Sequence, residues 1–177
     1  GGAAYLAFDG VQAHPRVRVN GREAGGWDYG YMGFTLDVTE FLKRGENRLE
    51  VSADTTKLES RWYPGGGLYR GVRLDVKPRE HVVPGSLAIV ATPCAAATSA
   101  VVKVSYVSSL YGPTGFVFTV ENPRLWDVDS PCLHEIDILG ERFAYGIRSM
   151  RFTADDGFWL NGRRLELHGV CLHSDLG

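Results

Sequence analysis

The stretch GFWLNGRRLELHGVCLHSDLG, residues 157–177, carries the clearest fold signal in this sequence of 177 residues. Asn161-Gly162 is a pair that accepts positive φ at both central positions of a type I′ turn, so a β-hairpin is predicted there. After the turn, alternate residues of an extended strand share one face. That face carries Leu165, Leu167, Gly169, Cys171, His173 and Asp175. We therefore expect a hairpin, and then a buried strand that ends in two polar side chains.

The composition indicates a folded protein rich in short strands. Hydrophobic residues make up 44% of the chain and aromatic residues 11%, which is typical of globular proteins. The 22 glycines amount to about 12%, against about 7% in average proteins. High glycine content together with many β-branched residues favours strands and tight turns over helices. A chain of this length can bury one good core or two small ones.

Charge and hydropathy exclude several classes of partner. A formal net charge of −2 argues against nucleic-acid binding, which normally requires a basic surface. No apolar run approaches the roughly 20 residues that span a bilayer, so no membrane association is expected. The sequence starts Gly1-Gly2-Ala3, without Met or an apolar leader, so any signal peptide is expected to lie outside it. The compartment is not indicated.

The cysteines and histidines predict no metal or cofactor site. Cys94, Cys132 and Cys171 cannot all pair and show no Cys-x-x-Cys spacing, so free thiols are expected. A single Cys94–Cys132 bridge is the alternative. His168 and His173 are five residues apart, which puts them on opposite faces of a strand and disfavours chelation.

Alternating patterns predict two antiparallel sandwiches in succession. In the first, strands are expected at residues 5–9, 16–19, 34–38, 48–54 and 72–77, with a type I′ turn at Asn20-Gly21. Thr39 is expected to cap one helical turn over residues 40–43. Residues 78–81 form a linker. In the second sandwich, strands are expected at residues 87–91, 100–107, 116–121, 133–138 and 142–145.

Residues 25–33, GGWDYGYMG, form a loop rich in glycine and aromatic residues. Trp27, Tyr29 and Tyr31 can expose flat apolar faces beside the Asp28 carboxylate, a combination that suits sugar rings. The same loop can equally serve as a lid over the edge of the sandwich. Both interpretations stay open at this point.

Four segments, read in order, resemble glycoside hydrolase family 2, the β-galactosidase and β-glucuronidase family. They are VRVNG (17–21) with FTLDVTEFLKRGENRL (34–49), SRWYPGGGLYRGV (60–72), ENPRLW (121–126), and FAYGIR (143–148) leading into residues 157–177. Residues 61–65 and 169–173 resemble the β-galactosidase branch more than the glucuronidase branch. The ordered set covers most of the chain.

The resemblance implies an all-β chain with three parts. Residues 1–79 would form a jelly-roll, galactose-binding-like domain without its first strands. Residues 80–152 would form a shortened immunoglobulin-like sandwich. Residues 153–177 would be the first hairpin and strand of a (β/α)₈ barrel whose remainder is missing. No strands are available between residues 107 and 116, and the 138–140 connection is tight. An edge left unpaired in this way is liable to associate, so homo-oligomers through the β domains are expected.

The implied activity is hydrolysis of terminal β-galactosides with retention, by a longer parent protein. Retaining glycosidases use two carboxyl groups about 5 Å apart. In this family both are glutamates on late barrel strands, and one follows an Asn. The four asparagines here, Asn20, Asn47, Asn122 and Asn161, precede Gly, Arg, Pro and Gly. We therefore expect no catalytic residue in this chain and no activity from the chain alone.

Three residues are candidate contacts to a β-galactoside substrate. Barrel sites lie at the C-terminal ends of strands, where His173 matches a family histidine that contacts sugar hydroxyls. Asp175 shares its face, and Asp28 lies where the jelly roll can lend a carboxylate. The competing interpretation is that His173 and Asp175 only cap the strand end.

Two other functions remain open. The chain could be a free-standing carbohydrate-binding module that uses Trp27, Tyr29 and Tyr31. It could also be a non-catalytic interaction fragment. A lone barrel strand that bears His173 has no use in a binding module, and this favours the hydrolase.

Overall fold

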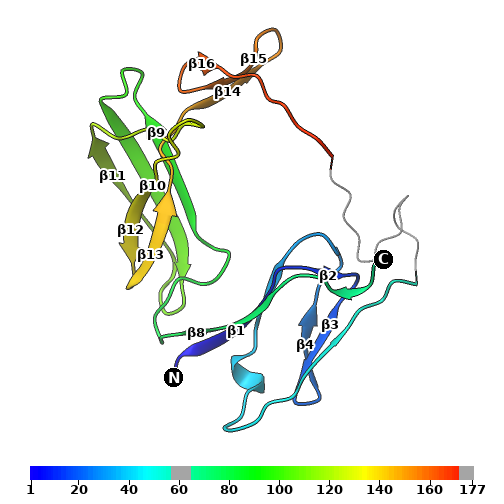
Figure 1. The fold of residues 1–177 in the computed structure, drawn as a ribbon. Helices are drawn as coiled ribbons and strands as arrows, with labels where there is room; N and C mark the ends of the chain where they lie inside the picture. Colours follow the sequence, from blue (N-terminus) through cyan, green and yellow to red (C-terminus); the bar gives the residue numbers. More distant parts are fainter. Residues whose placement is uncertain (57–64, 172–177) are drawn as a thin grey trace. The chain divides into compact units, whose positions relative to one another are not determined.

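The computed structural model describes residues 1–56 and 65–171. These residues form sixteen β-strands and one short 3₁₀ helix, which confirms the all-β class (Figure 1). The chain divides into two compact units, one containing Gly1–Arg79 and the other Glu80–Cys171. Each unit has a hydrophobic core of its own.

The first unit is built from two facing three-stranded sheets. One has the order β5-β1-β8, formed by Phe34–Asp37, Ala3–Phe8 and Val72–Lys77. The other has the order β4-β3-β6, formed by Arg22–Gly26, Arg16–Val19 and Leu49–Ser52. The short strands β2 (Val11–Gln12) and β7 (Gly67–Leu68) pair with each other. Every pairing is antiparallel, as the alternating pattern predicts.

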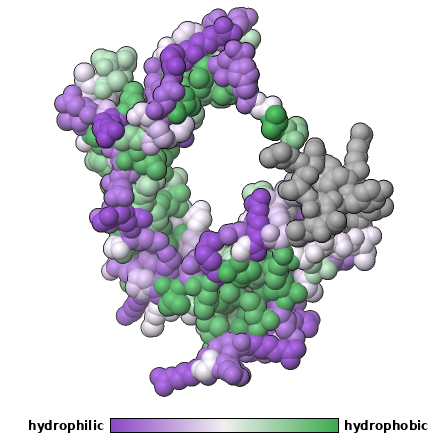
Figure 2. All heavy atoms as spheres, in the orientation of Figure 1, coloured by the Kyte–Doolittle hydropathy of each residue, from purple (hydrophilic) through white to green (hydrophobic). Residues whose placement is uncertain are grey.

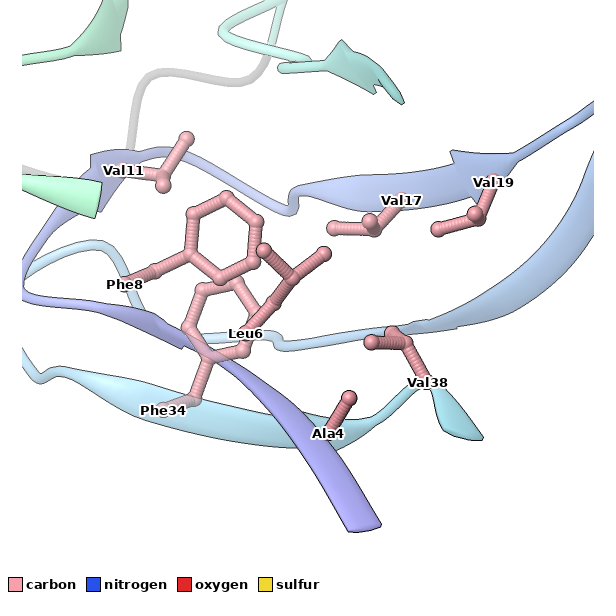
Figure 3. Packing of buried hydrophobic residues seen from close by; sticks show 8 residues of the cluster. All are labelled: Ala4, Leu6, Phe8, Val11, Val17, Val19, Phe34 and Val38. Atoms are coloured by element: carbon pink, nitrogen blue, oxygen red, sulfur yellow. The ribbon is translucent and has the colours of Figure 1, made fainter. Parts of the chain in front are cut away.

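Apolar side chains from both sheets meet in the core of the first unit. Figure 3 shows Leu6, Phe8 and Phe34 from one sheet packed toward Val17 and Val19 from the other. The Phe8 and Phe34 rings stack with centroids 4.7 Å apart. Because alternate residues of β3 point inward, Val17 and Val19 are buried while their arginine neighbours are exposed.

The turn between β3 and β4 has the predicted backbone. Asn20 and Gly21 have φ of 54° and 80°, which confirms the type I′ turn. The Asn20 amide also donates to the carbonyl of Phe41 (2.9 Å), and its oxygen accepts from the Arg48 N–H (3.0 Å). One residue therefore forms the turn and fastens two later segments to it.

The predicted helical turn needs a correction. The helix is a 3₁₀ turn, Thr39–Phe41, so Thr39 lies inside it and does not cap it. The Thr39 hydroxyl donates to Asp37 Oδ1 (2.6 Å) and accepts from the backbone N–H of Ala4 (2.9 Å). Because this hydroxyl is engaged with β1, it is not available as a helix cap.

The second unit combines a three-stranded sheet with a two-stranded hairpin. The sheet has the order β11-β10-β9, formed by Gly112–Glu121, Ser99–Ser108 and Ala88–Pro93. The hairpin joins β12 (His134–Ile138) to β13 (Glu141–Tyr145). Alternate residues of β10 are buried, and Val102 and Val104 pack with Ile138 and Ile147.

A further sheet, β14-β15-β16, follows within the second unit and contains the predicted hairpin. Its strands are Met150–Thr153, Gly157–Leu160 and Arg163–Arg164. Asn161 and Gly162 have φ of 50° and 77°, which confirms the second type I′ turn. The Asn161 amide donates to the carbonyl of Trp126 (2.9 Å), and Arg163 pairs with Asp127 (2.9 Å). These contacts hold the hairpin against the segment that precedes β12.

The buried strand expected after this hairpin is not formed. Pairing stops at Arg164, and residues 165–171 are in no strand. Leu167 is 65% exposed and Cys171 is also exposed, so this part of the predicted apolar face is not covered. A strand of a parallel barrel is stable only beside neighbours that accept its hydrogen bonds. The Leu165 N–H donates to the Phe158 carbonyl (2.9 Å), but among the described residues no strand lies beside residues 166–171.

Hydrophobic residues also reach the surface in both units (Figure 2). Among them are Val76 of β8, 74% exposed, and Val117 of β11, 62% exposed. None of the described segments forms a helix that is long and apolar enough to cross a bilayer.

All three cysteines are free thiols, so the alternative Cys94–Cys132 bridge is not formed. Cys94 lies exposed in the turn between β9 and β10, with its sulfur 3.5 Å from Thr98 Oγ1. This hydroxyl and the Ser99 backbone lower the pKa of the Cys94 thiol to about 6, because hydrogen bonds favour the thiolate.

Alkylation of Cys94 by iodoacetamide should therefore stay fast down to about pH 6 and slow below that value. Thr98→Val removes the hydroxyl and should move the midpoint of the pH–rate profile upward. Mass spectrometry of the labelled peptide measures the rate constant at each pH. A wild-type midpoint at about 8.5, the value of an ordinary cysteine, would contradict the hydrogen-bonded turn.

Candidate functional site: a braced aromatic loop

The candidate site is the loop between β4 and β5, with the sequence WDYGYMG at residues 27–33. Its large side chains point outward, and Trp27, Tyr29 and Tyr31 are 41%, 56% and 38% exposed. The Tyr29 and Tyr31 rings meet edge to face with centroids 5.7 Å apart. Sugar rings have apolar faces that pack on aromatic rings of this kind, while hydroxyls bond to nearby polar groups.

Residues outside the loop hold its backbone in place. The Tyr69 hydroxyl donates to the carbonyl of Gly30 (2.9 Å). Gln12 of β2 lies so close that a Cβ at position 30 would come within 2.6 Å of Gln12 Cδ. Gly10 is similarly required, because a Cβ there would lie 2.6 Å from the Tyr69 ring. The backbone of the loop is therefore held closely by Gln12 and Tyr69, and neither Gly30 nor Gly10 has room for a side chain.

The first residue of the loop is anchored to the core. The Trp27 ring lies nearly parallel to the Phe34 ring (7°), with centroids 6.1 Å apart. The Trp27 backbone N–H donates to the carbonyl of Pro15 (3.1 Å). Trp27 thus keeps one face on the core and part of its surface in solvent, which preorganises it for a ligand.

Asp28 is the one acidic side chain of the loop, and it is accessible. Its side chain is 86% exposed, and the nearest cation is Arg16, with Nη1 3.7 Å from Oδ1. An ion pair this long and exposed contributes little to stability. The Asp28 carboxylate is therefore able to accept hydrogen bonds from hydroxyl groups of a ligand beside the aromatic rings.

The oxygen of the Gln12 side chain is a second polar group at the base of the loop. Oε1 is buried and has no hydrogen-bond partner among the described residues. Such a group is costly to bury. Neither Gln12 nor Tyr69 is predicted from the sequence to be part of this site. The available signal was the pair Gly10 and Gly30, whose missing side chains make room for them.

The other predicted site residues are not described. His173 and Asp175 lie outside the described residues. Asp28 is therefore the predicted substrate contact that the structure places, and it lies together with Trp27, Tyr29 and Tyr31. His168 is described and exposed.

No family model matches the chain, but individual proteins do. β-Galactosidase BoGH2A of Bacteroides ovatus is 33% identical over 97% of this chain and 26% of its own length. β-Glucuronidase of Bacteroides fragilis is 27% identical over 97% of this chain and 32% of its own length. A solved glycosyl hydrolase family 2 member from Bacteroides cellulosilyticus superposes with a TM-score of 0.80 and 25% identity, over 98% of this chain and 28% of its own.

These matches first identify the class of protein, because the chain is similar to glycoside hydrolases. Within that class it is similar, along almost its whole length, to the N-terminal portion of glycoside hydrolase family 2 proteins. The family resemblance is thereby confirmed. The chain spans only about a quarter to a third of the relatives' length, and the relatives include both β-galactosidases and β-glucuronidases.

The match to the Bacteroides ovatus protein is longer than the chain itself. It extends over 217 positions, whereas 97% of 177 residues is about 172, so about 45 positions have no counterpart in this chain. The chain is therefore shortened relative to this protein inside the matched region.

Gly30→Ala tests the bracing of the loop. The added methyl would collide with Gln12, so we expect a lower unfolding temperature and altered Trp27 fluorescence, at a cost of about 1–3 kcal/mol. Gly169→Ala is the matched control, because a Cβ there has nothing within 4 Å. Thermal unfolding followed by fluorescence compares the two variants. Equal unfolding temperatures would show that Gln12 does not confine the loop.

Proposed function

We propose that the chain is the N-terminal, substrate-facing β portion of a retaining glycoside hydrolase that removes terminal β-galactosyl residues. The observation that carries the proposal is the braced loop, which displays three aromatic rings and an exposed carboxylate on one fixed backbone. The similarity to β-galactosidases over nearly the whole chain supports it.

In this proposal the parts of the chain have separate tasks. Residues 1–79 are a jelly-roll domain that presents the loop. Residues 80–152 are a shortened immunoglobulin-like sandwich. Residues 153–177 begin the catalytic barrel, and residues 165–171, which form no strand in the structure, would become its first strand beside the remainder of the barrel.

Within the site, Trp27, Tyr29 and Tyr31 would pack against the apolar face of a sugar. Asp28 would accept hydrogen bonds from sugar hydroxyls, and His173 and Asp175 would add further polar contacts. The two carboxyl groups that cleave the glycosidic bond would come from the remainder of the parent protein, because no Asn-Glu pair occurs in these 177 residues. The chain therefore binds and orients substrate but does not catalyse.

We propose a galactoside in preference to a glucuronide for two reasons. Residues 61–65 and 169–173 have the pattern of the β-galactosidase branch. In addition, Asp28 is the acidic group among the exposed rings, and a carboxylate repels the carboxylate of glucuronate more than it does a neutral sugar.

A second candidate function is a carbohydrate-binding module that works without a barrel. It is favoured by the exposure of Trp27, Tyr29 and Tyr31, which requires no partner domain. In that case the 177-residue chain would bind galactose by itself.

Hydrolysis of nitrophenyl β-galactoside and nitrophenyl β-glucuronide distinguishes these proposals. The chain alone should turn over neither substrate, whereas a version extended by its downstream coding sequence should hydrolyse the galactoside faster. Asp28→Asn in the extended protein should raise KM for the galactoside with little change in kcat, because binding is lost and chemistry is kept. Turnover by the chain alone, or preference for the glucuronide, would refute the proposal.

Titration of the chain with galactose, followed by Trp27 fluorescence, tests the second candidate. Saturable quenching that Trp27→Ala abolishes would support a binding module. Trp159→Phe is the matched control, because Trp159 lies in the second unit.

A further inference from the structure

Strand β11 forms a bare edge of the sheet in the second unit. It pairs with β10 over ten residues, from Gly112 opposite Ser108 to Glu121 opposite Ser99. Among the described residues no strand pairs with its other side, so β11 is the outermost strand of the sheet. Alternate N–H and C=O groups of an edge strand are open to another chain.

β11 carries Pro113 near its start and Glu121 at its end, but its middle lacks the protection that edge strands usually carry. Residues 114–120, TGFVFTV, contain no charge and no proline, and they are rich in residues that favour strands. Val117 is 62% exposed and Phe116 40% exposed. An uncharged segment of this kind pairs readily with a like segment.

Two other edge strands of the second unit, β12 and β9, carry more protection. β12 carries Glu135 and Asp137, and its partner β13 carries Arg142, which lies 3.4 Å from Glu135. β9 is only six residues long and ends at Pro93, which has no N–H to donate. Of these three edge strands, β11 has the longest stretch without a charge or a proline.

The turn before β11 lies between residues 107 and 116, where the immunoglobulin-like sandwich implied by the family resemblance would have further strands. β10 and β11 are joined through a tight turn in which Ser108 Oγ accepts from the N–H groups of Leu110 and Tyr111, each at 3.3 Å. The roughly 45 positions of the Bacteroides ovatus protein without a counterpart are enough for several strands. A strand lost at this turn would leave β11 uncovered.

The edge sequence is nearly symmetric about Val117. Phe116 and Phe118 flank it, and they stack within one chain with centroids 6.1 Å apart. If two copies pair antiparallel about a twofold axis at Val117, Val117 lies opposite its own copy and Phe116 lies opposite Phe118 of the other chain. Cross-strand aromatic pairs stabilise such a contact, and no like charges oppose one another.

We propose that β11 binds β11 of a second copy of this chain in antiparallel register centred on Val117. The contact joins the two three-stranded sheets into one continuous sheet. Main-chain hydrogen bonds supply the affinity, and the Phe-Val-Phe sequence fixes the register.

Charge substitutions at the axis test this register directly. Sedimentation velocity should show the wild-type chain as a dimer at micromolar concentration. Val117→Lys and Val117→Glu should each be monomeric, because two like charges then face each other across the axis. An equimolar mixture of the two variants should dimerise again, since lysine then faces glutamate.

Val90→Lys is the matched control. Val90 is 58% exposed on β9, and like Val117 it lies opposite Lys103 of β10. The control adds the same charge beside the same lysine on the other edge of the sheet, so it should remain dimeric. Circular dichroism verifies that each variant is folded. A monomeric wild type, dimers that persist in both Val117 variants, or failure of the mixture to re-form dimers would overturn the proposal.

Discussion

The hydrogen-bonding demand of extended backbone governs this molecule. Each strand needs a neighbour that takes up its N–H and C=O groups, and buried backbone without such partners is costly. Where neighbours exist, alternate side chains form the two cores around Phe8 and Val102. Where none exists among the described residues, the chain behaves differently: residues 165–171 form no strand, and β11 keeps one side open. The same constraint thus accounts for both the ordered and the incomplete parts of the fold.

Two asparagines, Asn20 and Asn161, each form a turn and also bond to a distant part of the chain. Asn20 and Asn161 each occupy the first central position of a type I′ turn with positive φ. Each also directs its amide to the carbonyl of a distant residue, Phe41 in the first unit and Trp126 in the second. Glycine at these positions would also adopt the positive φ of the turn, but the carbonyls of Phe41 and Trp126 would lose the hydrogen bond from the asparagine amide. This explains why Asn-Gly, with the asparagine first, suits both sites.

Much of the fold follows from sequence because its signals are local. Alternation in β3 and β10 predicted the buried faces, and the Asn-Gly pairs predicted both turns. Predictions failed where a distant partner decides the outcome. Thr39 looked like a helix cap but bonds to Ala4 of β1, and residues 165–171 had an apolar face but no strand to join. At the site, Asp28 and its aromatic neighbours were visible in the sequence. Gln12 and Tyr69 were not, because their role depends on which strands lie beside the loop.

In the loop at residues 27–33, different residues fix the course of the backbone and form the exposed surface. Gly30, Gln12 and Tyr69 determine where the backbone of the loop runs, whereas the more exposed rings belong to Trp27, Tyr29 and Tyr31. The side chains at positions 28, 29 and 31 can therefore be exchanged while the scaffold beneath them is unchanged. Substitutions at these three positions would change the exposed surface of the loop and leave its backbone in place. The residues that set the shape of the loop are thus different from those that set its surface chemistry.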